Sequence, residues 1–127
     1  MQKSKELLPI LTGQPVIPVV AVDSARQGVE LARALAAGGL KAIEVTMRTP
    51  AALDAIEAIV AEVPEAICGA GTILSPKHYE QASAAGSRFI VSPGATVELL
   101  DAAKAGSVPL LPGAATPSEL MAMIQEG

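Results

Sequence analysis

Two patterns of apolar residues alternate along the chain. Short runs of four to seven mostly apolar residues, rich in valine and isoleucine, are separated by longer segments with the three- and four-residue spacing of a helix. The helical pattern predicts helices over 4–11, 25–37, 50–62, 76–85, 97–105 and 117–126. The short runs predict strands over 16–22, 42–47, 66–69, 89–92 and 108–111.

Polar residues and glycines mark the ends of several expected helices. Ser24 and Ser75 stand just before the second and fourth helices, where a hydroxyl can accept a hydrogen bond from a free backbone N–H. Gly13 and Gly86 follow the first and fourth helices, where glycine can adopt the left-handed conformation that stops a helix. The chain therefore divides into an initial helix and a series of strand–helix units.

Short strands that alternate with helices through short turns are typical of a parallel sheet. No linker, charged block or low-complexity segment interrupts the alternation, so residues 1–127 are expected to form a single domain. Two α/β architectures fit: an open doubly wound sheet of flavodoxin-like order, and a (β/α)8 TIM barrel. In the second case the chain would form an incomplete barrel, with an N-terminal helix and five βα units. The strand number alone favours the open sheet.

Composition narrows the function classes. The chain is 50% apolar and only 2% aromatic, with a net charge of −4, and no segment concentrates lysine or arginine. We therefore expect no nucleic-acid partner and no membrane partner, and an anionic substrate would have to be held by single cations or backbone amides. The N-terminus shows neither a signal peptide nor a membrane span, which predicts a cytoplasmic protein. With one cysteine, Cys68, and one histidine, His78, we expect no disulfide and no bound metal.

The second predicted strand carries the most informative polar residues. Glu44 interrupts an apolar run, and strand alternation places it on one face with Thr46 and Arg48. A partly desolvated carboxylate beside a guanidinium is suited to general acid–base catalysis. A purely structural ion pair that fills the barrel is an equally good interpretation of the spacing.

Small residues follow the other strands. The segment 69–72 (GAGT) would let backbone amides approach a ligand, and Thr72 adds a hydroxyl. The segments 92–94 (SPG) and 112–113 (PG) occupy the same position after later strands. Simple tight turns explain all three segments as well, so they are candidates only through their place at the carboxyl ends of parallel strands.

Taken together, the strand ends resemble one enzyme family and favour the barrel. The segments are 15–19 (PVIPV), 43–50 (IEVTMRTP), 69–74 (GAGTIL), 89–94 (FIVSPG), 109–113 (PLLPG) and 116–120 (TPSEL). In this order and spacing they resemble the 2-keto-3-deoxy-6-phosphogluconate (KDPG) / 4-hydroxy-2-oxoglutarate aldolase family, over essentially the whole chain. The resemblance implies a lyase, a class I aldolase of the Entner–Doudoroff type, which cleaves KDPG to pyruvate and glyceraldehyde 3-phosphate.

The resemblance also implies roles for single residues. Glu44 would be the catalytic carboxylate that transfers protons, Arg48 would bind the carboxylate of the pyruvyl group, and Thr72 with the loop at Pro93 would shape the pyruvate pocket. The partner is a small-molecule substrate, no metal or organic cofactor is implied, and a homo-oligomer is expected.

One feature of the family has no counterpart in these residues. The resemblance places the lysine that forms the Schiff base on a sixth strand, after Gly127, and none of the chain's lysines matches it: Lys3, Lys5, Lys41, Lys77 and Lys104. Five strands also leave two open sheet edges. The alternative hypothesis is therefore a non-catalytic barrel fragment that self-associates through these edges.

Overall fold

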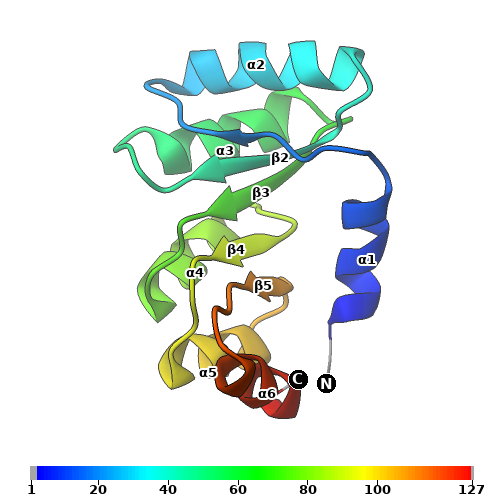
Figure 1. Cartoon of the computed structure of the whole chain (residues 1–127). Helices are drawn as coiled ribbons and strands as arrows, with labels where there is room; N and C mark the ends of the chain where they lie inside the picture. Colours follow the sequence, from blue (N-terminus) through cyan, green and yellow to red (C-terminus); the bar gives the residue numbers. More distant parts are fainter. Residues whose placement is uncertain (1–2, 127) are drawn as a thin grey trace.

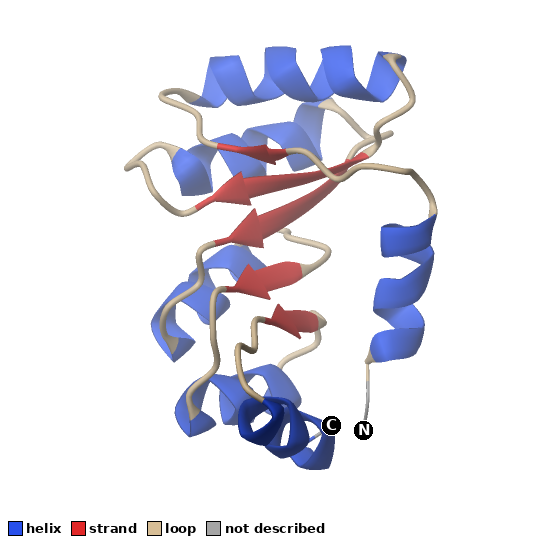
Figure 2. Cartoon of the chain, viewed as in Figure 1, coloured by secondary structure: helices blue, strands red, loops and turns tan. Residues whose placement is uncertain are grey.

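The computed structural model describes residues 3–126, which form one curved sheet with helices around it (Figures 1 and 2). The helices are α1 (Ser4–Thr12), α2 (Ala25–Ala37), α3 (Ala52–Glu62), α4 (Pro76–Ala84), α5 (Val97–Ala105) and α6 (Pro117–Glu126). The strands are β1 (Val19–Val20), β2 (Ala42–Thr46), β3 (Ile67–Gly71), β4 (Ile90–Ser92) and β5 (Leu110–Pro112). Helices and strands alternate from β1 to α6 as the apolar pattern predicts. No helix in residues 3–126 is both long enough and apolar enough to cross a membrane.

Strand order decides between the two predicted architectures. The five strands are all parallel and neighbours in space follow chain order, β1-β2-β3-β4-β5. A flavodoxin-like sheet would need the order 2-1-3-4-5, so the open-sheet alternative is wrong. Sequential order with a helix after each strand is the arrangement of a (β/α)8 barrel. Within the described residues the barrel is not closed, because β1 and β5 each pair on one side only.

Alternate residues of the strands bury two separate apolar clusters. The outward residues Ile43, Val45 and Ile90 pack beneath the helices that follow the strands, in the larger cluster. The inward residues Ala42 and Phe89 pack against α1 in a smaller cluster. Figure 1 shows α1 beside the ends from which the strands start. The interior is therefore apolar at the amino ends of the strands, which leaves the carboxyl ends for polar residues.

The first strand is much shorter than predicted. We expected a strand over 16–22, but only Val19–Val20 pairs with β2. Pro15 and Pro18 have no N–H to donate, so the chain before β1 cannot form a regular ladder; the Pro18 carbonyl still accepts a hydrogen bond from Glu44 N at 2.9 Å. The other observed boundaries differ from the predicted ones by two residues or fewer. One example is β3, which continues through Gly71 because the whole of β2 pairs with it.

Helix ends agree with the capping prediction except at Gly13. Ser24 Oγ and Ser75 Oγ accept hydrogen bonds from Gln27 N and His78 N, and Gly86 is left-handed with φ 95°. Gly13 has φ −72°, a right-handed conformation, so the prediction of a left-handed stop there is wrong.

Gln14 replaces the missing part of β1. Its Nε2 donates to Val16 O at 2.7 Å and to Ala42 O at 2.9 Å, while its Oε1 accepts from Ala42 N at 2.8 Å. The side-chain amide thus pairs with the backbone of β2 as a neighbouring strand would. Ala42 is buried, so its N–H and C=O depend on this one side chain.

Gln14→Ala is expected to lower the free energy of unfolding by about 1–3 kcal/mol, because it leaves a buried backbone N–H and C=O unpaired. Urea denaturation measures the change. Gln81→Ala is the matched control, since Gln81 is exposed on α4 and its side chain forms no hydrogen bond in residues 3–126. Equal stabilities of the two variants would contradict this role for Gln14.

Candidate functional site

The four predicted site residues lie at the carboxyl ends of neighbouring strands. Glu44 is in β2 and Arg48 is in the turn that follows β2; Thr72 comes directly after β3, and Pro93 directly after β4. Because β2, β3 and β4 are parallel neighbours, these residues share one edge of the sheet. Glu44 is only 9% exposed, whereas Arg48 and Pro93 are exposed.

The Glu44 carboxylate lies over β3 rather than beside its own partner in the ladder. The register pairs Glu44 with Gly69, yet the side chain extends over Gly71, where its Oε1, Cδ and Cγ take the place of a Cβ. No hydrogen bond or ion pair in residues 3–126 engages this carboxylate. Burial raises the pKa of Glu44, and the positive charge of Arg48 opposes part of that rise.

This geometry bears on the two interpretations of the Glu44–Arg48 pair. Their charges interact, but no ion pair forms between them in the described part of the chain. A buried carboxylate that is neither paired nor hydrogen-bonded is costly to keep charged. Its pKa is shifted upward from that of an ordinary glutamate, which suits an acid–base group better than a structural ion pair.

Arg48 is held by Thr72. Arg48 Nε donates to Thr72 Oγ1 at 3.2 Å, and no hydrogen bond in residues 3–126 uses its two terminal nitrogens. Thr72 has φ 60°, the one positive φ outside glycine in this part of the chain. A β-branched residue rarely adopts this conformation, and such strain costs about 1–3 kcal/mol where the surrounding fold imposes it. Nothing in the sequence signals this strained backbone at Thr72.

Two threonines, one at the end of β2 and one in the turn after it, tie the short β1 and the residues that follow it to the site. Thr46 Oγ1 donates to Val20 O at 3.0 Å, and Thr49 Oγ1 donates to Val22 O at 2.6 Å. Thr46 shares the inward face with Glu44, as strand alternation predicts, but its hydroxyl is used by the backbone next to it. The sequence contains no separate signal for the role of Thr49, which lies in the segment 43–50 (IEVTMRTP).

Pro93 packs against the end of β5. A Cβ on Gly113 would overlap the Pro93 carbonyl group, and Gly113 N donates to Ser92 O at 2.8 Å. The loops after β4 and β5 are therefore in close contact. Pro93 follows β4 and Glu44 lies in β2, so the two residues are two strands apart. Ser92 is buried, and its hydroxyl has no hydrogen-bond partner in residues 3–126. It alternates with Val91, which faces the interior, so it points away from the Glu44 side of the sheet.

No nucleophile accompanies Glu44 in the described residues. Burial raises the pKa of Cys68 to about 12, so its thiol stays protonated. No hydrogen bond or ion pair joins a lysine of residues 3–126 to Glu44, Arg48 or Thr72. The same residues contain no group of three or more His, Cys, Asp or Glu side chains that could hold a metal ion.

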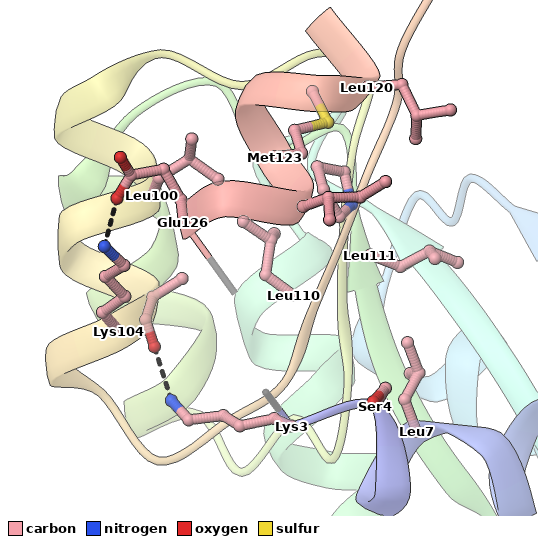
Figure 3. Close-up of a pocket in the computed structure, with 13 residues that line it drawn as sticks. Lys3, Ser4, Leu7, Leu100, Lys104, Leu110, Leu111, Leu120, Met123 and Glu126 are labelled. Carbon is pink, nitrogen blue, oxygen red and sulfur yellow. Dashed lines mark hydrogen bonds and ion pairs between the residues drawn. The ribbon is translucent and has the colours of Figure 1, made fainter. Parts of the chain in front are cut away.

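A cavity of about 450 Å³ lies elsewhere, along the unpaired edge of β5 (Figure 3). Its walls come from α1, β5, α5 and α6 and are mainly apolar, and Lys104 pairs with Glu126 at its rim. Lys3 donates to carbonyls at the end of α5 beside it. α6 has no buried residue, and Leu120, Met121 and Ile124 on it are all more than half exposed.

Comparisons with known proteins find one family. The sequence profile described as "KDPG and KHG aldolase" matches residues 8–127. The "KHG/KDPG aldolase" of Escherichia coli (strain K12) is 53% identical over 112 residues, which are 88% of this chain and 53% of that protein. The chain therefore spans about half the length of the curated relatives it matches.

Solved structures agree with the sequence comparison. The KDPG aldolase of Zymomonas mobilis ZM4, solved with 3-phosphoglycerate, superposes with a TM-score of 0.91 at 42% identity and covers 97% of this chain and 58% of that one. The KDPG aldolase of Legionella pneumophila, with pyruvate captured at low pH as a covalent carbinolamine intermediate, gives 0.89 at 42% identity over 93% and 57%.

Proposed function

Because this chain belongs to the KDPG and KHG aldolase family, we propose that it carries the proton-transfer and carboxylate-binding part of a class I aldolase. The proposed reaction is cleavage of KDPG to pyruvate and glyceraldehyde 3-phosphate. The observation that carries the proposal is the buried, unpaired carboxylate of Glu44 at the same strand edge as the Arg48 guanidinium, which Thr72 holds.

Glu44 is the proposed catalytic acid–base residue. In a class I aldolase, a lysine amine attacks the C2 carbonyl, and loss of water from the carbinolamine gives an iminium. A base then takes the proton of the C4 hydroxyl; the C3–C4 bond breaks, and its electrons move into the iminium to give an enamine. A carboxyl group with a raised pKa donates, in its protonated form, the proton that the leaving water takes, and as a carboxylate it accepts the proton of the C4 hydroxyl. Protonation of the enamine at C3 and hydrolysis of the resulting iminium then release pyruvate and the lysine. The reacting lysine is proposed to come from outside the described residues.

Arg48, Thr72 and Pro93 are the proposed substrate-binding residues. The Nε of Arg48 is occupied by Thr72, so its two terminal nitrogens are free to grip a carboxylate with two parallel hydrogen bonds. Thr72 and the loop at Pro93 would border the pyruvyl group on the side of β3 and β4. The expected ligand is therefore a small 2-oxo acid.

Two measurements test the proposal. Pyruvate added to 15N-labelled protein is expected to shift the amide signals of Arg48 and Thr72. Pyruvate release from KDPG is followed with lactate dehydrogenase and NADH in a protein that contains this chain together with the reacting lysine. Borohydride added with pyruvate to the 127-residue chain, followed by intact mass, is expected to give no covalent adduct. An adduct would place the reacting lysine in this chain instead. The absence of both the amide shifts and the pyruvate release would overturn the proposed function.

Arg48→Lys is expected to weaken pyruvate binding about tenfold or more, because an ammonium cannot replace two parallel hydrogen bonds. Titration calorimetry or the same NMR shifts measure the change. Arg88→Lys is the matched control: Arg88 is also exposed, but it precedes β4 at the opposite edge of the sheet. Equal losses in both variants would mean that Arg48 is not the carboxylate-binding residue.

A second candidate function is self-association without catalysis. It is favoured by the unpaired edges of β1 and β5 in residues 3–126 and by the exposed apolar face of α6 beside the cavity. A second copy of the chain could cover these surfaces.

If α6 mediates such contacts, Ile124→Glu is expected to raise the dissociation constant of the dimer about tenfold or more, because a charge would be buried unpaired. Light scattering over a concentration series measures it. Val97→Glu is the control, since Val97 is at least as exposed but lies at the start of α5, away from the cavity. A monomer at all concentrations would exclude the second candidate.

A further inference from the structure

Both inward positions near the end of β3 are glycines, and side chains from its neighbours fill the space that they leave. A Cβ on Gly69 would overlap the ring of Phe89, which comes from the β4 side. A Cβ on Gly71 would overlap Oε1 of Glu44, and would lie 2.5 Å from its Cδ and 2.8 Å from its Cγ. Side-chain atoms do not approach this closely, so any residue with a Cβ at 71 must displace the Glu44 side chain.

The backbone does not explain why position 71 is glycine. The left-handed glycines in residues 3–126 are Gly39 and Gly86, so Gly71 has a conformation that alanine also adopts. Its carbonyl accepts an ordinary ladder hydrogen bond from Met47 N at 2.8 Å. On backbone grounds alone, alanine would restrict the unfolded chain and favour folding. The neighbouring carboxylate is therefore the specific reason for the missing Cβ.

The register shows what the missing Cβ allows. Glu44 stands opposite Gly69, and Thr46 stands opposite Gly71. The Glu44 side chain must therefore cross β3 diagonally, toward the carboxyl end of the strand, to lie over Gly71. This path brings the carboxylate to the residue before Thr72, which holds Arg48. Because the ring of Phe89 fills the space at Gly69, a carboxylate displaced from Gly71 cannot move deeper and would turn away from β3.

We propose that Gly71 is a positioning residue for Glu44: the absence of a Cβ at 71 lets the carboxylate lie over β3 at the strand end where Thr72 holds Arg48. The catalytic importance of that position rests on the proposed function, but the position itself does not. This assignment differs from the expectation that the small residues of segment 69–72 serve to let backbone amides approach a ligand, since at Gly71 a side chain of the protein occupies the space.

The test compares Gly71→Ala with Gly94→Ala. Gly94 also follows a strand at this edge of the sheet, but a Cβ there meets no atom within 4 Å. The titration of the Glu44 carboxyl carbon is followed by 13C NMR, with Glu44→Gln used to assign its signal. Burial raises the pKa of Glu44 in the unchanged protein. Gly71→Ala is expected to move the pKa back toward that of an ordinary glutamate, and Gly94→Ala to leave it unchanged.

A Gly71→Ala protein in which Glu44 titrates as before would overturn the proposal. The measurement uses no substrate, so it is independent of whether the protein cleaves KDPG. Conversely, a shifted pKa without any effect on pyruvate binding or cleavage would leave the positioning role in place and remove the proposed function.

A double-mutant cycle covers the case in which Gly71→Ala folds poorly. In the Glu44→Ala background the side chain that overlaps a Cβ at 71 is gone, so Gly71→Ala is expected to lower the urea midpoint in the unchanged protein and not in that background. The same loss in both backgrounds would show that another contact excludes the Cβ, and would overturn the proposal.

Discussion

In a protein that contains this chain together with the reacting lysine, Glu44→Gln is expected to lower the rate of KDPG cleavage by about 10²- to 10⁴-fold, and it should make the folded protein more stable at neutral pH. The loss of rate follows from removing a general acid–base group, since an amide has a similar shape but cannot exchange the proton. The gain in stability, about 0.5–2 kcal/mol, follows because the amide avoids the cost of holding a charge in a buried position. If Glu44 had a purely structural role, its replacement would not combine a loss of cleavage rate with a gain in stability.

The direction of the pKa shift determines how the stability gained by Glu44→Gln varies with pH. Burial raises the pKa of Glu44, so the folded protein binds this proton more tightly than the unfolded chain does. The stability that this binding adds is fully present below the ordinary carboxyl pKa and is lost as the pH rises through the raised pKa. The advantage of Glu44→Gln should therefore be large at neutral pH and shrink as the solution is acidified.

Urea denaturation of both proteins over a pH series measures the difference. Glu57→Gln is the matched control, because Glu57 is exposed on α3 and joins no ion pair in the described residues. An advantage for Glu44→Gln that stays constant with pH would mean that the carboxylate is not the source of the effect. Unchanged cleavage by Glu44→Gln would remove Glu44 from the proposed mechanism.

The order of elements could be predicted from the sequence because it depends on local patterns. The helices at 25–37, 97–105 and 117–126 have the predicted bounds, since their apolar spacing lies within the segments and their capping residues lie beside them in the sequence. Strand order is not local in this way. Alternating strands and helices are compatible with an open sheet and with a barrel, and only the resemblance of the strand ends to an aldolase family favoured the barrel.

Site residues could be predicted from the sequence where a charged residue interrupts an otherwise apolar strand. Glu44 could be chosen because a carboxylate in an apolar strand needs a reason, and Arg48 because it follows with the same alternation. The role of Gly71 could not be predicted, because it depends on the Glu44 side chain of β2, which crosses to β3. No local pattern signals the left-handed conformation of Thr72. In the sequence, the segment 69–72 has the same composition as a simple turn.

Phe89→Ala is expected to cost about 3–5 kcal/mol of the free energy of unfolding, the usual range for emptying a fully buried aromatic site. Phe89 is the only phenylalanine of the chain and is 1% exposed. Its ring covers Gly69 and packs with Leu7 of α1 and Ala42 of β2. Gly69 beneath the ring has no side chain of its own to fill the space that the ring leaves.

The position of Phe89 makes this loss consequential for the site above it. Gly69 and Gly71 are successive inward residues of β3, so the ring fills the interior directly below the Glu44 carboxylate. This one change would remove a large fraction of the free energy of unfolding, which is about 5–15 kcal/mol for a typical domain. Urea denaturation measures the loss, and Val97→Ala, at a residue 69% exposed, should stay within about 0.5 kcal/mol of the unchanged protein. Hydrogen exchange should also show earlier opening of α1, because Leu7 loses its contact with the ring. If α1 stays protected in Phe89→Ala, other contacts hold this helix in place.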